Sequence, residues 1–214
     1  MGGAPAGPQT LILCYAVTTL GPMAAVDSSG YDERDCDSGG EVFMMARPPV
    51  LSIVGCGKCG KTTLIERLVT ELTRRGWTVG TLKHDVHGFQ MDHEGKDTWR
   101  HRQAGAKAVC IVGPGQVGLV RSVPEEGFTT ADAIALLGPV DIVITEGFKR
   151  ERFPKIEIFS SARNEGRLLC AEDPTLMAVA GDLPVETDLP RFDWNDIAAI
   201  ADFVEERLLR RREG

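Results

Sequence analysis

The residues best suited to chemistry form a glycine-rich stretch that matches the phosphate-binding pattern Gly-x4-Gly-Lys-Thr. A polyphosphate must contact several backbone N–H groups at once, so glycine is needed where a Cβ would block the approach or where φ is positive. Lys61 adds a mobile cation for the β and γ phosphates and is the candidate catalytic residue, while Thr62 offers a hydroxyl to Mg²⁺. The predicted nucleotide-binding residues are Gly55, Cys56, Gly57, Lys58, Cys59, Gly60, Lys61, Thr62 and Thr63.

The flanks of this stretch provide the elements that must position it. Residues 50–54 read as a short buried strand, and residues 64–72 carry apolar side chains at helical spacing. Strand, glycine-rich loop and helix form the context that the motif requires. The positive end of the helix dipole then points at the bound anion. With both flanks correct, a chance match is the weaker explanation.

A second polar cluster follows an expected strand at residues 78–83, and all four histidines lie in it. The carboxyl ends of strands in an open α/β sheet face the ligand crevice, so this cluster is expected near the phosphate loop. A dense mixture of charged and histidine side chains on a long loop favours function over packing. The predicted substrate or partner residues here are Lys83, His84, His87, Asp92, Lys96, Asp97 and Arg100.

Three interpretations of this cluster compete. In the favoured one its basic residues meet phosphates or a phosphorylated partner molecule, while Asp85 or Asp92 helps to hold Mg²⁺. In another, His84, His87 and His93 form a transition-metal site with Asp92 as a further candidate ligand, although no paired cysteines complete a zinc pattern. The third is a solvated polar loop.

A third cluster begins where an apolar strand, residues 140–145, ends in an acid as a Walker B strand does. Glu146 is therefore the preferred Mg²⁺ partner, either directly or through water. Gly147 allows a sharp turn, after which Lys149 and Lys155, with two arginines between them, form a basic patch. A solvated charged loop explains these basic residues equally well.

The six cysteines are scattered and form no disulfide framework, which is typical of the reducing cytoplasm. Cys56 and Cys59 match Cys-x-x-Cys, a redox or metal-binding spacing. Inside a phosphate loop the simpler interpretation is preferred, in which a small side chain fills space and the backbone binds the ligand.

Composition and charge limit the possible partners. The chain has 214 residues, 43% of them hydrophobic and 26% charged, as in a globular protein with a proper core. A net charge of −7 and a pI near 5.2 argue against a general nucleic-acid binder. No apolar run is long enough to span a bilayer, so we expect no membrane association.

Residues 1–48 differ from the remainder, because they are rich in Gly, Ala, Pro, Ser and Asp and carry six acidic against two basic side chains. We predict a disordered N-terminal extension there, and Met44 or Met45 would also serve as a start. Residues 49–214 form the predicted P-loop nucleotide-binding domain. Its pattern predicts a mainly parallel α/β sheet with helices on both faces and a short β-hairpin insertion. The further expected elements are strands at 108–112, 117–121, 155–159 and 176–180, and helices at 130–137 and 195–211.

Taken together, these motifs resemble the MobB family of molybdopterin-guanine dinucleotide biosynthesis adapter proteins. The resemblance covers about residues 50–205. It is carried by the P-loop with Gly-Lys-Thr-Thr, by Lys-His-Asp-Val-His-Gly-Phe at 83–89, by Gly-Lys-Asp-Thr-Trp-Arg at 95–100 and by Glu-Gly-Phe-Lys at 146–149. The second and fourth of these segments are far more specific than the P-loop alone. Cys56 and Cys59 depart from the small residues expected there.

The resemblance implies a GTP-binding protein with weak intrinsic hydrolysis, commonly a homodimer. It also implies assistance to MobA, the guanylyltransferase that joins GMP to molybdopterin, and possible contact with molybdopterin itself. In the wider P-loop class two acids join the P-loop threonine around Mg²⁺, and by position these are Asp85 and Glu146 with Thr62. The protein is then at most a slow GTPase that acts as an accessory.

Two alternatives remain open from the residues. A small-molecule kinase on the same fold would hold its acceptor in the loop of residues 84–102, and a metallochaperone NTPase would bind metal through the histidines of residues 84–101. The sequence contains no Asn-Lys-x-Asp motif to select guanine over adenine.

Overall fold

The computed structural model describes residues 47–85, 88–89, 91–124, 127–164, 167–182 and 185–209. The predicted disordered extension falls almost entirely outside these ranges and stays a prediction. The elements of the described part are, in order, β1 (Val50–Gly55), α1 (Lys61–Arg74), β2 (Val79–Lys83), α2 (Asp97–Gln103), β3 (Ala108–Gly113), β4 (Gln116–Arg121), α3 (Thr130–Ala135), β5 (Ile142–Glu146), β6 (Lys155–Phe159), β7 (Leu176–Gly181), β8 (Arg191–Phe192), α4 (Ile197–Val204) and the π-helix η1 (Glu205–Leu209).

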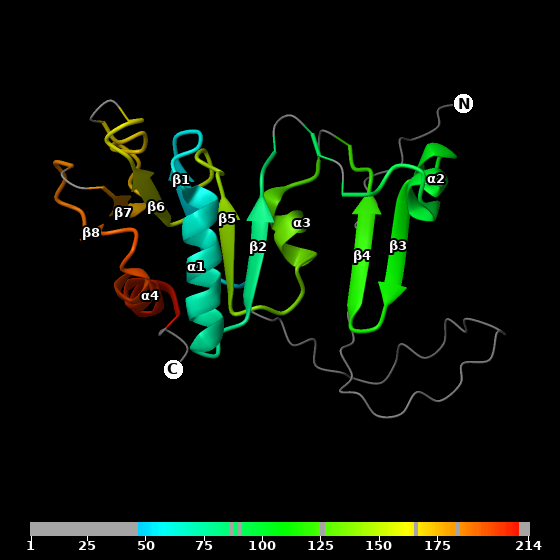
Figure 1. Cartoon of the computed structure of the whole chain (residues 1–214), viewed down its shortest axis with the longest axis horizontal. Helices are drawn as coiled ribbons and strands as arrows, with labels where there is room; N and C mark the ends of the chain where they lie inside the picture. The colour runs from blue at the N-terminus through cyan, green and yellow to red at the C-terminus, as the bar shows by residue number, and fades with distance from the viewer. Residues whose placement is uncertain are drawn as a thin grey trace, which may run out of the picture. The chain divides into compact units, whose positions relative to one another are not determined.

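Six strands form one parallel sheet in the order β2-β5-β1-β6-β7-β8 (Figure 1). Every pair of neighbours is parallel, which confirms the predicted sheet. The central strand β1 is buried along its whole length, as expected for an apolar run covered on both faces. Its neighbours β5 and β6 bring Glu146 and Ile156 into register with Ile53. Glu146, the last residue of β5, thus lies at the same edge of the sheet as the loop that follows β1.

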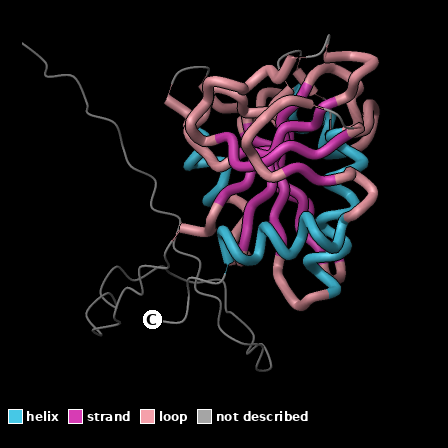
Figure 2. The backbone as a smooth tube through the Cα atoms, turned by 90° about the vertical axis from the view of Figure 1, so that its left-hand side faces the viewer, coloured by secondary structure: helices cyan, strands magenta, loops and turns pink. Residues whose placement is uncertain are grey.

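The two faces of the sheet are covered differently. Helices α1 and α4 pack on one face around a core that contains Leu51, Ile144 and Leu68. On the other face, a Cβ at Gly80 of β2 would lie 3.1 Å from Leu137, which follows α3. Loops cover that second face over β6 and β7. Figure 2 shows helices and loops on the outer sides of the strands, so helices on both faces are confirmed.

The predicted hairpin insertion is the two-stranded antiparallel sheet β3-β4. The sequence did not reveal α2, because residues 84–102 read as one polar loop. This helix has seven residues and none is buried, so it lacks the apolar periodicity that marks a helix in sequence. β8 was also missed, since two residues give no pattern.

The last helix starts later than predicted, at Ile197. Asp196 caps α4, because its Oδ1 accepts from the Ala199 N–H at 3.2 Å. Asp193 accepts from the Asn195 N–H at 2.7 Å in the turn before the helix. This turn holds Trp194 and Asn195 next to the start of α1, which matters for the site.

Candidate nucleotide-binding site

The loop between β1 and α1 has the backbone that a phosphate cradle requires. Gly55 has φ 151°, and a Cβ there would lie 2.7 Å from the Cys59 sulfur and 2.9 Å from the carbonyl oxygen of Ile158. Gly60, immediately before the helix, has φ 98°. Only glycine accommodates both constraints at Gly55 without displacing the sheet. The glycines that the motif demanded therefore have a steric reason in this chain.

Lys61 folds over this loop. Its Nζ donates to the carbonyl oxygen of Cys56 at 2.6 Å and lies 4.0 Å from the Cys59 sulfur. Burial raises the pKa of the Cys59 thiol, and the Lys61 cation opposes this shift. Cys56 donates its S–H to Asn164 Oδ1 at 3.3 Å. Both cysteines thus fill small sites inside the loop, and the lysine cation lies within reach of any anion held there.

The structure brings Thr62 and Glu146 together. The Thr62 hydroxyl donates to Glu146 Oε2 at 3.1 Å, although the two residues are 84 positions apart in the sequence. Glu146 ends β5 beside β1, and the chain then turns at Gly147 (φ 94°) and Phe148 (φ 56°). A hydroxyl and a carboxylate at this spacing are oxygen ligands of the kind that Mg²⁺ prefers.

Three residues of the second cluster lie at the same edge. Lys83 is in register with Glu146, and the His84 N–H lies 3.5 Å from the Glu146 carbonyl oxygen. The His84 ring contacts the Phe148 ring with centroids 5.3 Å apart. Two of the three predicted Mg²⁺ ligands, Thr62 and Glu146, are therefore in contact, and the third, Asp85, lies two residues beyond the end of β2.

The remainder of the second cluster surrounds the start of α2. The Thr98 hydroxyl donates to Asp92 Oδ1 at 2.7 Å, Lys96 immediately precedes α2, and Asp97 occupies its first turn. Arg100 is exposed one turn later. His87 lies outside the described residues. Within the described ranges, no three His, Cys, Asp or Glu side chains gather as a metal-binding group.

The two lysines of the third cluster differ. Lys149 is exposed, whereas Lys155 is fully buried and forms an ion pair with Asp173 at 3.0 Å. Its Nζ also donates to Thr175 Oγ1 at 2.6 Å and to carbonyl oxygens of the preceding turn. Lys155 therefore does not belong to the predicted basic patch. Its buried cation instead stabilises the start of β6.

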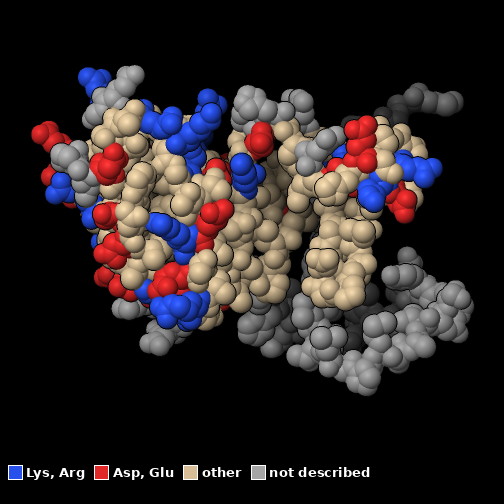
Figure 3. Space-filling model, viewed as in Figure 1, with Lys and Arg blue, Asp and Glu red and all other residues tan. Residues whose placement is uncertain are grey.

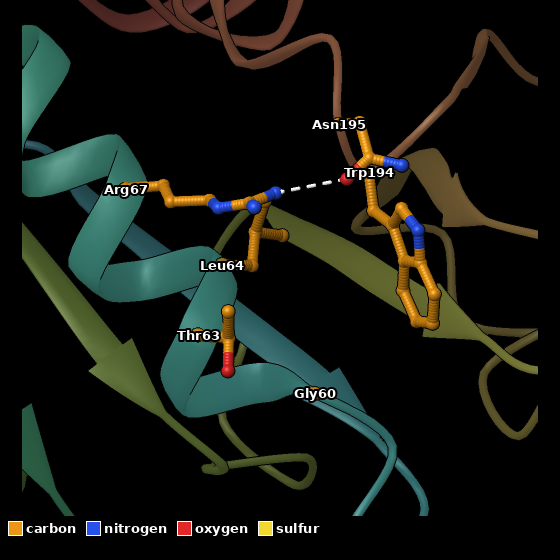
Figure 4. A pocket seen from close by; sticks show the side chains of 6 residues that line it. All are labelled: Gly60, Thr63, Leu64, Arg67, Trp194 and Asn195. Atoms are coloured by element: carbon orange, nitrogen blue, oxygen red, sulfur yellow. Dashed lines mark hydrogen bonds between the residues drawn. The ribbon is translucent and has the colours of Figure 1, made fainter.

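A cavity of about 250 Å³ next to the loop was missed by the sequence analysis (Figure 4). It lies between the first turns of α1 and the turn before α4, and Arg67 spans it by donating to Asn195 Oδ1 at 3.0 Å. The half-buried Trp194 ring lies 3.6 Å from the position of a Cβ at Gly60. The lining residues are Gly60, Thr63, Leu64, Arg67, Trp194 and Asn195.

The parallel sheet, the glycine-rich loop and the acid at the end of β5 define a P-loop α/β protein. Residues 50–182 match the family described as MobB, molybdopterin guanine dinucleotide synthesis protein B. A molybdopterin-guanine dinucleotide biosynthesis adapter protein of Haemophilus influenzae is 36% identical over 170 residues, covering 78% of this chain and 93% of the relative. The Escherichia coli protein of the same description is 32% identical over 161 residues, or 74% and 92% of the two chains. This chain therefore belongs to the MobB family.

Solved structures agree with this assignment. A crystal structure of molybdopterin-guanine biosynthesis protein B has a TM-score of 0.59 at 29% identity, covering 73% of this chain and 98% of that one. Bacillus subtilis MobB has a TM-score of 0.59 at 27% identity, with 75% and 98% covered. Among the residues that the structure describes, no helix has the length and apolar character needed to cross a membrane.

Proposed function

We propose that this protein binds GTP together with Mg²⁺ and acts as an adapter in the attachment of GMP to molybdopterin. The contact between Thr62 and Glu146 carries the nucleotide part, since it pairs the loop hydroxyl with a strand-end carboxylate where the metal of a bound nucleotide would lie. Asp85, at the end of the next strand, completes the proposed ligand set. The loop backbone and Lys61 take the phosphates.

Hydrolysis is proposed to be slow. Phosphoryl transfer needs an in-line water and charge neutralisation beyond one lysine and one metal ion. The sequence offers no assignable arginine finger or water-positioning glutamine. A protein of this kind holds its nucleotide for a time and presents it, which suits an accessory role better than fast turnover.

The proposed partner is a MobA-like guanylyltransferase, with molybdopterin as a possible further ligand. Support comes from the names of the relatives and from two exposed cations, Lys83 at the end of β2 and Lys149 shortly after β5. Lys96 and Arg100 are also exposed, but at α2, beside the hairpin (Figure 1). We place this step in the cytoplasm, in keeping with the four free cysteines of the described residues, Cys56, Cys59, Cys110 and Cys170.

We also propose a homodimer, formed through the hairpin β3-β4. Four apolar side chains share one face of this ribbon and all are exposed, namely Cys110, Val112, Val117 and Leu119. Arg121, at the end of β4, is the one charged side chain of the two strands, and the rest of the ribbon visible in Figure 3 is neither acidic nor basic. A two-stranded ribbon with an exposed apolar face is marginal in water, so a second copy of the same face is a fitting cover.

Titration calorimetry with GTP and with ATP, each with Mg²⁺, tests the nucleotide part. We expect GTP binding with slow turnover, and loss of binding in Lys61→Ala without a change in thermal unfolding, because Lys61 is a partly exposed residue at the first position of α1 and lies outside the core clusters. Lys107→Ala is the charge-matched control on an exposed loop. Unchanged GTP affinity in a folded Lys61→Ala protein would remove the site, and a preference for ATP with fast turnover would favour the kinase alternative.

The adapter role needs a test in cells. Deletion of the gene is expected to lower the pool of guanylated molybdopterin without abolishing it, and the wild-type gene, but not Lys61→Ala, should restore it. An unchanged pool in the deletion strain would contradict the adapter role while leaving nucleotide binding intact.

A further inference from the structure

The position of the cavity relative to the loop points to a second part of the nucleotide site. In the sheet order, β5 lies on one side of β1, whereas β6, β7 and β8 lie on the other. Glu146 ends β5, and Trp194 and Asn195 follow β8. The proposed metal site therefore lies on the β5 side of the start of α1, and the cavity on the β8 side.

A nucleotide bound by the loop has a defined direction. Lys61 contacts the β and γ phosphates, and Thr62 binds the Mg²⁺ ion. Because Thr62 is hydrogen-bonded to Glu146, the γ-phosphate end of the nucleotide points towards Glu146. The nucleoside must then leave the loop on the side away from Glu146. Gly60 and Thr63 line the cavity on that side, which makes it continuous with the phosphate cradle.

The cavity has the groups that a nucleobase requires. Trp194 is half-buried, packs against the core and presents its indole beside Gly60, so its position is fixed before any ligand arrives. An aromatic face stacks on a base with about 1–3 kcal/mol per base. A volume of about 250 Å³ lies below the roughly 300–1,000 Å³ of sites for whole drug-sized ligands, so it suits one portion of a nucleotide.

We propose that this cavity holds the guanine base of the nucleotide, with Trp194 stacking on the base and Arg67 reading its edge. The inference rests on the proposed function, because it assumes that the loop binds a nucleotide. Guanine offers two acceptors, O6 and N7, whereas adenine places an amino donor where O6 would be. Arginine carries only donors, and Asn195 fixes the guanidinium by accepting one of its N–H groups at 3.0 Å. Arg67 thus supplies the guanine preference that the absent Asn-Lys-x-Asp motif leaves unexplained.

The neighbouring cavity of about 410 Å³ is a poorer candidate. It shares Arg67 and Asn195 but lies further along α1 and is lined by Glu66 and Glu71. It reaches none of the loop glycines.

Calorimetry with three probes tests the inference, namely GTP, ATP and inorganic tripolyphosphate, each with Mg²⁺. Tripolyphosphate reports the loop alone. We expect Trp194→Ala to weaken GTP about tenfold or more and to leave tripolyphosphate unchanged, with Trp194→Phe restoring part of the loss. Arg67→Gln, at an exposed position that folds without difficulty, is expected to lower the GTP-over-ATP preference about tenfold through GTP alone. Arg74→Gln on the same helix is the matched control.

Each outcome separates this inference from the function on which it rests. If Trp194→Ala and Arg67→Gln bind GTP as the wild type does while Lys61→Ala does not bind it, the base lies elsewhere. That result would overturn this inference alone. An equal loss of GTP and tripolyphosphate in Trp194→Ala would mean that the indole only supports Gly60, which also overturns it. Failure of the wild-type protein to bind GTP would overturn the proposed function and this inference together.

Discussion

The six-stranded sheet and the hairpin β3-β4 are built from similar apolar residues but have opposite surroundings. All six residues of β1 are buried, whereas none of the residues of β3 or β4 is. Ile53 has 0% exposure and Ile111 61%. The apolar sequence alone therefore does not decide burial; the elements that cover a strand decide it.

The difference shows which region buries its apolar residues within a single chain. The sheet has α1 and α4 on one face, and its loop and acid meet through Thr62 and Glu146. The hairpin contacts the short helix α2 through β3, but apolar side chains such as Ile111, Val112 and Val117 stay exposed. We therefore expect mutations in the sheet to change the stability of each subunit and mutations in the hairpin to change association.

The largest effect is expected where two strands of the sheet approach most closely. A Cβ at Gly181 in β7 would lie 1.9 Å from the carbonyl oxygen of Phe159 in β6. Gly181→Ala must therefore displace backbone and is expected to cost roughly 4 kcal/mol of unfolding free energy, measured by urea denaturation. Gly113→Ala in β3 is the control, because a Cβ there meets nothing closer than 3.8 Å. Equal losses in both variants would contradict the contrast between the regions.

In the hairpin we expect a change in association. Val112→Lys combined with Val117→Glu replaces a directly opposed, exposed apolar pair by an ion pair that keeps the ribbon together. Removing four valines from a symmetric interface should weaken the dimer by about 3 kcal/mol, or more than a hundredfold in Kd. Analytical ultracentrifugation measures this change.

The unfolding free energy of the monomer should stay within about 0.5 kcal/mol of wild type in the same double variant, because both positions are on the surface. A dimer of unchanged affinity would place the interface on another face. A wild-type protein that is monomeric at micromolar concentration would contradict the homodimer itself.

A smaller effect is expected at the entrance to β6, where Asp173 pairs with the buried Lys155. Hydrogen bonds from Thr175, and then from Lys155, lower the pKa of Asp173 to about 2. A depressed folded pKa stabilises the protein above the unfolded value near 3.8, and this contribution is lost as pH falls through the folded value near 2. Asp173→Asn should lower the unfolding free energy by about 2 kcal/mol at pH 7. Between pH 4 and 2 the unfolding free energy of the variant should fall less than that of the wild type.

Acid unfolding followed by circular dichroism measures this difference. The exposed neighbour Glu172 gives the control, Glu172→Gln, which should behave as wild type over the same range. A parallel acid dependence in Asp173→Asn and wild type would mean that the pair contributes nothing to stability.

The sequence sufficed where a local pattern determines the outcome. The loop of residues 55–63, the strands β1 and β5 and the short helix α3 all depend on neighbours within a few residues. The prediction that Glu146 ends a strand beside the loop also held, because parallel strands of an apolar run end at one edge.

Residues that depend on distant partners could not be predicted in this way. Buried Lys155 is paired with Asp173 and Thr175, which lie about 20 residues further along the chain. The Trp194 cavity depends on the sheet order, which sets β8 and the turn after it on the far side of β1. A tryptophan and an asparagine ahead of a helix carry no local signal of an adjacent cavity.

The smallest effect is expected at Glu146, whose side chain lies at the end of β5, outside the hydrophobic clusters and the hairpin. Glu146→Gln keeps an oxygen that can accept from Thr62, so stability and dimer affinity should equal those of wild type. Loss of the negative charge should weaken Mg²⁺-dependent GTP binding about tenfold, as for other groups that hold or orient a metal. Calorimetry of GTP over a range of Mg²⁺ concentrations measures this, and Glu151→Gln, on the exposed turn after the strand, is the control. An unchanged Mg²⁺ dependence would mean that Glu146 only orders the loop, through its hydrogen bond with Thr62. Thr62 and Asp85 would then be the remaining metal ligands.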